Sequence, residues 1–332
     1  MDIVYKLPFP KEVCTKIFMY VCKSPHTGLG DVALKHIIGF DIYDKLVANN
    51  GIILNNDRNI VEFLDFQNGW ILSFQEQNRL TFDIFHLNML RNLTIINLCC
   101  RGVSGDIANL KSLVNLTEIN ICGTSISGDI KNLKYLRNLS VIALGGSDDT
   151  SITGNIAHLG SLDNLTKIEF ISTNVYGDIA HLRSLHNLTQ INFCSTGVHG
   201  DIINLESLRN LNDIKLTNKG VYGNIKYLNT LTKLNLIWLY DTDVTGDISH
   251  LNMLRELNNI NIGNTVITGD IIHLKLLDNL KIIILEGTNV YGNISDIKPL
   301  DKLLHVDLNN TCVTASDLDR IHYYESDCAL II

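Results

Sequence analysis

A tetrapeptide ending in Gly-Asp-Ile or Gly-Asn-Ile recurs along most of this 332-residue chain. It occurs as SGDI (104–107), SGDI (127–130), TGNI (153–156), YGDI (176–179), HGDI (199–202), YGNI (222–225), TGDI (245–248), TGDI (268–271) and YGNI (291–294). Consecutive glycines are 23 residues apart, except for one interval of 26 residues between Gly128 and Gly154. A fixed period of this length predicts a stack of similar units, because one such unit cannot bury its apolar face alone.

One complete unit, NLTEINICGTSISGDIKNLKYLR (115–137), shows the pattern within a period. Leu116, Ile119 and Ile121 have the spacing LxxLxL, and Gly128 and Ile130 follow them. This pattern resembles the leucine-rich repeat, LxxLxLxxNxL, and its GxI ending is similar to the plant-type variant of that family. The resemblance covers roughly residues 70–318, where ten copies hold one phase.

The resemblance implies an α/β fold, namely a right-handed, curved leucine-rich-repeat solenoid. A parallel sheet would form the concave face, and short helical or 3₁₀ segments the convex face. The residues agree with this, since a short LxL strand sends its leucines to the core and the residues between them outward. The glycine suits a tight corner, and the IxxLxxL that follows has helical or 3₁₀ spacing.

Threonine usually stands where the family has asparagine. We expect its hydroxyl to bond neighbouring loop backbone, so that a threonine ladder replaces the asparagine ladder of the family. The threonines concerned are Thr124, Thr173, Thr196, Thr242, Thr265, Thr288 and Thr311.

The two ends of the chain depart from the repeat. Residues 1–60 predict a small α-helical N-terminal cap, with helical candidates at 10–22 and about 30–48. The solenoid is expected to span 61–318, with 61–83 as a degenerate first repeat, and 319–332 to form a C-terminal cap. TFDI (81–84) is a degenerate copy of the motif, and TASDL (314–318) ends the series one residue out of step.

The segment FPKEVCTKIFMYV (9–21) is also similar to the opening of an F-box, LPxEvxxkIfxyL. Its possible ligase contacts are Pro10, Glu12, Ile17, Phe18 and Tyr20. This resemblance implies a partner in a cullin-ligase adaptor, with the repeats holding the substrate. Past residue 22 the second F-box helix and its tryptophan have no clear counterpart, so a plain helical cap over the first repeat stays open as the alternative.

The amino-acid composition limits the kinds of partner expected for this chain. The chain carries 27 Lys and Arg against 35 Asp and Glu, a net charge of −8, which argues against nucleic-acid binding. The opening residues form no secretory signal, and no uncharged apolar run reaches membrane-spanning length. We therefore expect a cytoplasmic protein without a membrane partner. Its eight cysteines include no CxxC pair and are interpreted as thiols, not as a disulfide framework or a zinc site.

Two regular columns of potentially reactive side chains lack the partners that chemistry needs. Cys99, Cys122 and Cys194 share one outward strand column, without the further ligands of a metal site. The histidines His86, His158, His181, His250 and His273 each lie two residues after a motif isoleucine. No nucleophile, base and acid come together in adjacent columns, so we predict no enzyme, no cofactor and no metal.

The repeat that contains LNLIWLYDTDV (234–244) can be aligned in two registers. Counting back from Gly246 places Leu234, Ile237 and Leu239 in the core and projects Trp238 from the concave face. The rival register starts from TLTKLNL (230–236) and makes IWLYD a bulged loop. It needs an insertion and a compensating deletion, so the first register is preferred.

In the first register an apolar group rimmed by polar residues lies on the concave face. Such groups mark interaction sites, and Trp and Tyr often dominate them. The predicted protein-binding residues are Lys215, Leu236, Trp238, Tyr240, Asp241, Asn259, Asn261, Ile282 and Ile284. We predict a non-catalytic scaffold that binds a protein ligand there, and the alternative is a substrate adaptor of an F-box type ubiquitin ligase.

Overall fold

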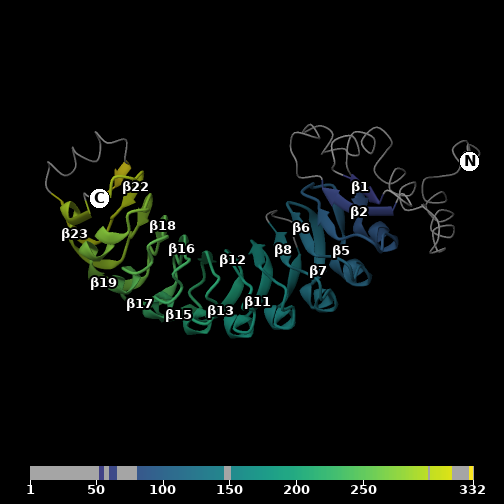
Figure 1. Ribbon diagram of the computed structural model, residues 1–332, viewed down its shortest axis with the longest axis horizontal. Coiled ribbons are helices and arrows are strands. Elements are labelled where there is room, and N and C mark those ends of the chain that lie inside the picture. Colours follow the sequence, from purple (N-terminus) through teal and green to yellow (C-terminus); the bar gives the residue numbers. More distant parts are fainter. Residues whose placement is uncertain are drawn as a thin grey trace, which may run out of the picture.

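The computed structural model describes residues 52–55, 60–65, 81–145, 151–297, 300–315 and 329–331. These residues form a curved solenoid with one sheet on the inner side of the arc and short helices on the outer side (Figure 1). The helical cap predicted at 10–22 and 30–48, and with it the F-box-like segment, lies outside the described residues.

The inner sheet has thirteen strands, and all neighbours in it are parallel except β1 and β2, which pair antiparallel. Its strands in spatial order are β1 (Ile52–Asn55), β2 (Ile60–Asp65), β4 (Ile95–Asn97), β6 (Glu118–Cys122), β8 (Val141–Gly145), β10 (Lys167–Ile171), β12 (Gln190–Phe193), β14 (Asp213–Leu216), β16 (Leu236–Trp238), β18 (Asn259–Asn261), β20 (Ile282–Ile284), β22 (His305–Asp307) and β24 (Ala329–Ile331). Thus β1 lies in the predicted N-terminal cap, and β24 extends the sheet from the predicted C-terminal cap.

A second parallel sheet, which the sequence analysis did not anticipate, runs along the solenoid with eleven strands. They are β3 (Phe82–Asp83), β5 (Val103–Asp106), β7 (Ser125–Asp129), β9 (Ile152–Asn155), β11 (Asn174–Asp178), β13 (Gly197–Asp201), β15 (Val221–Asn224), β17 (Asp243–Asp247), β19 (Val266–Asp270), β21 (Asn289–Asn293) and β23 (Cys312–Thr314). Each contains the residues before the motif isoleucine, and in most repeats a buried Val or Ile two residues before the glycine suits an extended segment.

The convex segments are 3₁₀ helices, one after each strand of the second sheet except β23 in the described part of the chain. They are η2 (Ile84–Met89), η3 (Ile107–Ser112), η4 (Ile130–Tyr135), η5 (Ile156–Leu159), η6 (Ile179–Leu182), η7 (Ile202–Leu205), η8 (Ile225–Leu228), η9 (Ile248–Leu251), η10 (Ile271–Leu276) and η11 (Ile294–Ile297). Apolar residues three apart eclipse one another in a 3₁₀ helix, so Ile202 and Leu205 of η7 are both buried.

The recurring Gly-Asp pair links each repeat to the next. Asp178 is the N-cap of η6, and its Oδ1 accepts a hydrogen bond from the Ala180 backbone N–H at 2.7 Å. Gly200 of the following repeat has φ +122°, and a Cβ there would overlap this same Oδ1. The motif therefore needs glycine for two reasons, a backbone angle that side chains disfavour and close approach to the preceding cap.

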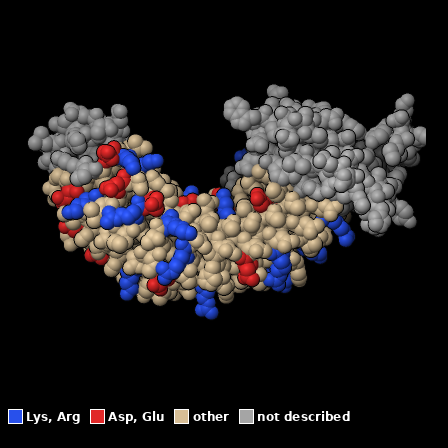
Figure 2. Space-filling view, viewed as in Figure 1, with Lys and Arg blue, Asp and Glu red and all other residues tan. Residues whose placement is uncertain are grey.

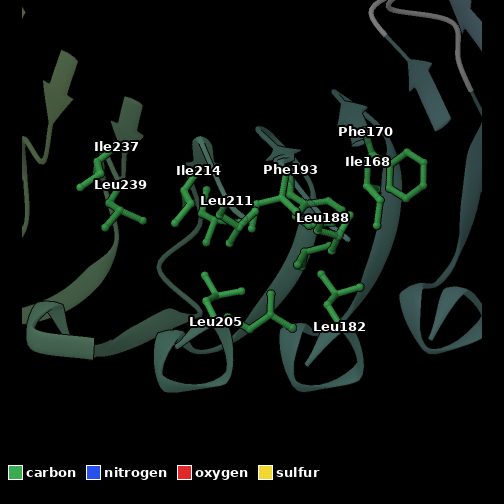
Figure 3. Packing of buried hydrophobic residues seen from close by; sticks show 14 of the residues in the cluster. Ile168, Phe170, Leu182, Leu188, Phe193, Leu205, Leu211, Ile214, Ile237 and Leu239 are labelled. Atoms are coloured by element: carbon green, nitrogen blue, oxygen red, sulfur yellow. The ribbon is translucent and has the colours of Figure 1, made fainter. Parts of the chain in front are cut away.

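The core lies between the inner sheet and the convex helices. Phe170 and Phe193 point inward from β10 and β12, while Leu182 and Leu205 face them from η6 and η7 (Figure 3). The two phenylalanine rings are 5.8 Å apart between centroids and pack at 53°. A continuous column of fully buried leucine and isoleucine follows the arc from repeat to repeat, as the periodicity predicts.

The threonine ladder takes a different form from the one predicted. Six of the seven threonine hydroxyls donate to the carbonyl three residues earlier in their own turn, for example Thr242 to Leu239 at 2.7 Å. Thr173 is the exception, since its buried hydroxyl has no hydrogen-bond partner in the described structure. These bonds stabilise the turn within a single repeat and do not join neighbouring repeats.

Side-chain links between repeats come from the Asn-Leu-Thr or Asn-Leu-Ser triplets that precede β6, β8, β10 and β12. Asn115 Nδ2 donates to the Arg91 carbonyl at 3.0 Å, and Thr117 Oγ1 donates to the Thr94 carbonyl at 3.0 Å. The same pair of bonds recurs at Asn138 and Ser140, Asn164 and Thr166, and Asn187 and Thr189. An asparagine ladder is thus present, at a position that the sequence analysis did not assign to it.

Candidate protein-binding surface

The strand pairing confirms the first register of the tryptophan repeat. Leu234, Ile237 and Leu239 are fully buried, whereas Leu236 is half-buried and Trp238 is 39% exposed. Trp238 lies in register with Lys215 on one side and Asn261 on the other. The pairing keeps the 23-residue offset on both sides of β16, so this strand carries no bulge. The insertion in the 26-residue interval falls between β8 and β9.

Leu236, Trp238, Ile282 and Ile284 form an apolar patch on the concave face, called the concave patch below. Leu236 and Trp238 come from β16, and Ile282 and Ile284 come from β20. Both isoleucines are half-buried. The strand between them, β18, supplies Asn259 and Asn261 in the same two columns. The register therefore brings together the apolar residues that the sequence analysis grouped.

Asn261 is buried, unlike a freely exposed contact residue. Its side chain is only 6% exposed, and its Oδ1 accepts from the Gly263 backbone N–H at 3.2 Å. Asn120 and Asn192 make the same bond to the residue two positions on. Asn261 consequently fixes the end of its strand, while Asn259 remains half-buried at the surface.

Tyr240 follows β16 and leans over the next repeat. Its phenol oxygen accepts a hydrogen bond from Asn264 Nδ2 at 2.7 Å. A Cβ on Gly263 would lie 3.1 Å from its ring, so the small residue there leaves room for the aromatic side chain. Tyr240 is half-buried for this reason, and Trp238 is the more exposed aromatic of the pair.

Lys215 and Asp241 complete the residues predicted for this surface. Lys215 is half-buried beside Trp238 in β14. Asp241 occupies the turn after β16 with φ +57° and pairs with Lys219 at 3.5 Å. Both partners of that ion pair are largely exposed, so it contributes little to stability.

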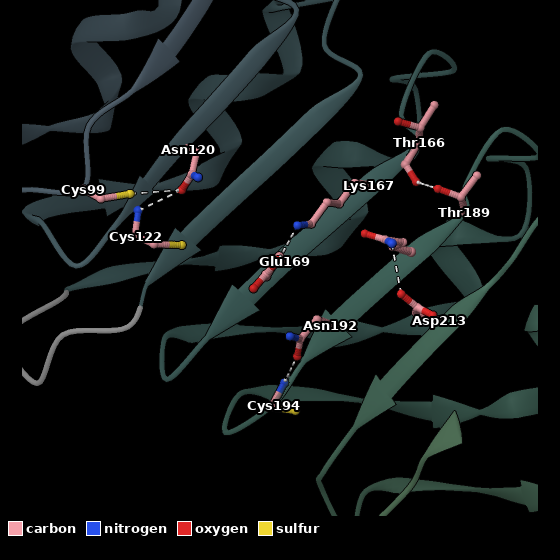
Figure 4. Close-up of polar contacts among 11 residues, drawn as sticks. Cys99, Asn120, Cys122, Thr166, Lys167, Glu169, Thr189, Asn192, Cys194 and Asp213 are labelled. Carbon is pink, nitrogen blue, oxygen red and sulfur yellow. Dashed lines mark hydrogen bonds and ion pairs between the residues drawn. The ribbon is translucent and has the colours of Figure 1, made fainter. Parts of the chain in front are cut away.

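The neighbouring strands toward the N-terminus are polar. Lys167 pairs with Glu169 at 2.7 Å on β10, and Gln190 Nε2 donates to Asp213 Oδ2 at 2.9 Å (Figure 4). In the space-filling view, acidic and basic side chains are interspersed over the visible face of the arc (Figure 2). The concave patch is therefore bordered by polar strands on this side.

A hollow that the sequence analysis missed opens beside these strands. It has a volume of about 410 Å³ and is lined by Gln190, Asn212, Asp213, Lys233, Asn235 and Glu256. Most of these residues lie just before the strands, outside the residues predicted for the site. The sequence signal that could have pointed to this hollow is the 23-residue spacing of its lining residues, such as Asn212 and Asn235.

The column of thiols shows no feature of a reactive site. Burial raises the pKa of Cys122 to about 12 and the pKa of Cys194 above its ordinary value. Cys99 Sγ lies 3.7 Å from the side-chain oxygens of Asn97 and Asn120 (Figure 4). A thiol with a raised pKa is a poor nucleophile near neutral pH. Among the described residues no three His, Cys, Asp or Glu side chains group closely enough to hold a metal ion.

Similar proteins were found by comparison with solved structures. No family model matches the chain, and no curated protein matches it in sequence. The leucine-rich-repeat ectodomain of the Arabidopsis thaliana membrane receptor kinase GASSHO1/SCHENGEN3, solved with Casparian strip integrity factor 2, is similar at 21% identity and a TM-score of 0.58 over 70% of this chain. The protein is a curved leucine-rich-repeat solenoid. It spans only 33% of that ectodomain chain.

Two further structures resemble this solenoid over more of their own length. Internalin InlF from Listeria monocytogenes is 22% identical with a TM-score of 0.52, over 74% of this chain and 75% of the internalin chain. A plant ice-binding protein is 18% identical with a TM-score of 0.66, over 86% of this chain and 94% of its own chain. At such identities the likeness establishes the fold. Within the described part of the solenoid, none of the helices has the length and hydrophobicity to span a bilayer.

Proposed function

We propose that this solenoid is a non-catalytic scaffold that holds a protein ligand on its concave face. The observation that supports it best is the concave patch, because Leu236, Trp238, Ile282 and Ile284 place apolar surface on a sheet whose preceding strands are polar. Exposed apolar residues with a polar border are characteristic of interaction sites. The similar receptor-kinase ectodomain was solved with a bound factor, so the fold is compatible with ligand binding.

The residues of the proposed site have different roles. Trp238 is the anchor, since it is large, exposed and central, and such residues often dominate binding energy. Leu236, Ile282 and Ile284 supply the surrounding apolar contact. Tyr240, Lys215, Asp241 and Asn259 form the polar border, and Asn261 holds β18 in place from within.

The test compares two aromatic substitutions of similar exposure. A partner isolated with the intact protein should bind Trp238→Ala at least about tenfold more weakly, as expected for an interface anchor. Tyr176→Ala is the matched control, because Tyr176 is 49% exposed but lies in β11 of the second sheet. Equal binding of all isolated partners to folded Trp238→Ala and to the control would refute the site.

The second candidate function is a substrate adaptor of an F-box type ubiquitin ligase in the cytoplasm. It rests on the match of residues 9–21 to the F-box opening, with Pro10, Glu12, Ile17, Phe18 and Tyr20 as proposed contacts. The test is co-purification of a cullin-ligase adaptor with the full chain. Loss of that adaptor from the double variant Ile17→Ala and Phe18→Ala would support the candidate, and no association with the intact chain would reject it.

A further inference from the structure

The hollow beside β14 adjoins the concave patch. Asp213 lines the hollow and lies in register with Leu236 of the patch. A ligand side chain could therefore enter the hollow while its neighbour in the same chain contacts Leu236 or Trp238. An extended segment can therefore contact the hollow and the patch together.

The carboxylates of the hollow form no direct ion pair within the described residues. No ion pair joins Asp213 or Glu256 to another residue in the described part of the chain. Asp213 accepts a hydrogen bond from the neutral amide of Gln190, and the Lys233 ammonium in the same hollow donates to Asn210 Oδ1 at 2.7 Å. Burial raises the pKa of Asp213, although Lys215 and Lys167 act in the opposite direction. A partly desolvated carboxylate of this kind gains from a cation brought by a ligand.

Acidic side chains also border the other end of the concave patch. Asp307 of β22 is in register with Ile284, and Glu286 follows β20. The outward positions of the repeats from β14 to β22 are residues 213, 215, 217, 236, 238, 240, 259, 261, 263, 282, 284, 286, 305, 307 and 309, all within the described part of the chain. Lys215 is the only lysine or arginine among them. The patch thus has carboxylates at both ends and apolar surface between them.

The distance between the two acidic ends sets the length of the segment. Asp213 and Asp307 are four strand steps apart, which at about 4.8 Å per step is roughly 19 Å. An extended chain advances about 3.3–3.6 Å per residue, so about six residues cover this distance. A segment of this length can place a cation at each end and two or three apolar side chains between them.

We propose that the ligand segment is a basic, extended peptide with a Lys or Arg at each end of a short apolar run. One cation enters the hollow at Asp213 and Glu256, and the other faces Asp307 and Glu286. The apolar run covers Trp238 and its neighbours. This inference rests on the proposed function, because it names the partner chemistry of the same concave surface.

The experiment is a selection from a random dodecapeptide display library on the immobilised full chain. The selected peptides are then measured as labelled synthetic peptides by fluorescence anisotropy. We expect enrichment of apolar runs flanked by Lys or Arg, about tenfold weaker binding to Asp213→Asn and to Asp307→Asn, and weaker binding as salt is raised. Lys215→Ala should bind more tightly, since it removes a charge of the same sign as the ligand. Tyr176→Ala serves as the control and should bind normally.

The remaining outcomes separate the two proposals. Peptides that lose binding to Trp238→Ala but are not basic, or that ignore Asp213→Asn and Asp307→Asn, overturn the basic-peptide inference and leave the concave site standing. Peptides that bind folded Trp238→Ala as well as they bind the intact chain, or a selection without enrichment, count against both. Circular dichroism of each variant identifies any that have lost the fold. If Asp213→Asn does not fold, Asp213→Glu, which keeps the charge, takes its place and is expected to retain binding.

Discussion

Alanine in place of Gly200 should destabilise the solenoid by about 2–4 kcal/mol. The backbone angle of φ +122° costs an alanine about 1–3 kcal/mol. The added Cβ also overlaps Asp178 Oδ1, so the carboxylate must leave and the N-cap bond to Ala180 is lost. Loss of an N-cap typically costs about 1 kcal/mol. The two contributions together give the expected range.

A double-mutant cycle with Asp178→Ala tests the mechanism. Asp178→Ala alone removes the cap and should cost about 1 kcal/mol. In the double variant the cap is lost only once, so its cost should fall short of the sum of the single variants by about 1 kcal/mol. Gly197→Ala is the control, because Gly197 lies in the same strand without a left-handed φ, and an added Cβ would meet the Tyr176 Cβ at 3.1 Å.

Urea unfolding followed by circular dichroism measures these differences, with the transition slope compared across variants. A cost for Gly200→Ala within about 0.5 kcal/mol of that for Gly197→Ala would show that neither the angle nor the overlap matters as described. Strict additivity of Gly200→Ala and Asp178→Ala would show that the glycine and the cap do not interact.

Three other measurements follow from single contacts. Thr242→Val should cost about 1 kcal/mol in urea unfolding, because the Leu239 carbonyl loses its donor. Thr173→Val should be neutral or stabilising, because that hydroxyl has no partner in the described structure. Equal costs for the two variants would contradict this reasoning. Iodoacetamide should modify exposed Cys312 well before Cys122, whose pKa is raised to about 12, as followed by site-resolved mass spectrometry. The rate of modification at Cys122 should rise about tenfold per pH unit over the range 7–9. Similar rates at the two thiols at pH 7 would refute the burial of Cys122. Asp213→Asn should raise the unfolding free energy at pH 7, because the folded-state pKa of Asp213 lies above its ordinary value and the charged form is disfavoured on folding. That gain should disappear as the pH falls through the folded-state value to below the unfolded one, and a gain that persists in acid would have another cause.

The parts of the fold that depend on one repeat were predictable from sequence. Ile237 and Leu239 lie inside and Trp238 outside because a two-residue alternation and a fixed period leave little freedom once the phase is known. The second sheet was not predictable in the same way, since the extended form of segments such as Asn174–Asp178 is completed by pairing with the next repeat.

The candidate surface shows the same division. Register alone grouped Leu236 with Ile282 on the concave face. The lean of Tyr240 depends on the space left by Gly263, and the hollow depends on how Lys233 and Glu256 are placed in separate repeats. Those features arise between repeats, where a pattern read within a single period carries little information.

The contact between each motif glycine and the preceding cap has a consequence for how such a chain can change its length. Each of the nine units with the motif glycine presents it toward the Asp or Asn cap of the unit before. The junction made when one such unit is duplicated or removed is therefore the junction already present elsewhere. The three extra residues of the 26-residue interval fall between β8 and β9 in the sequence, Gly154 after them still meets the Asp129 cap, and the series continues in phase. Recombination in whole periods could thus widen or narrow the concave face across generations, while each strand keeps the chemistry it already has.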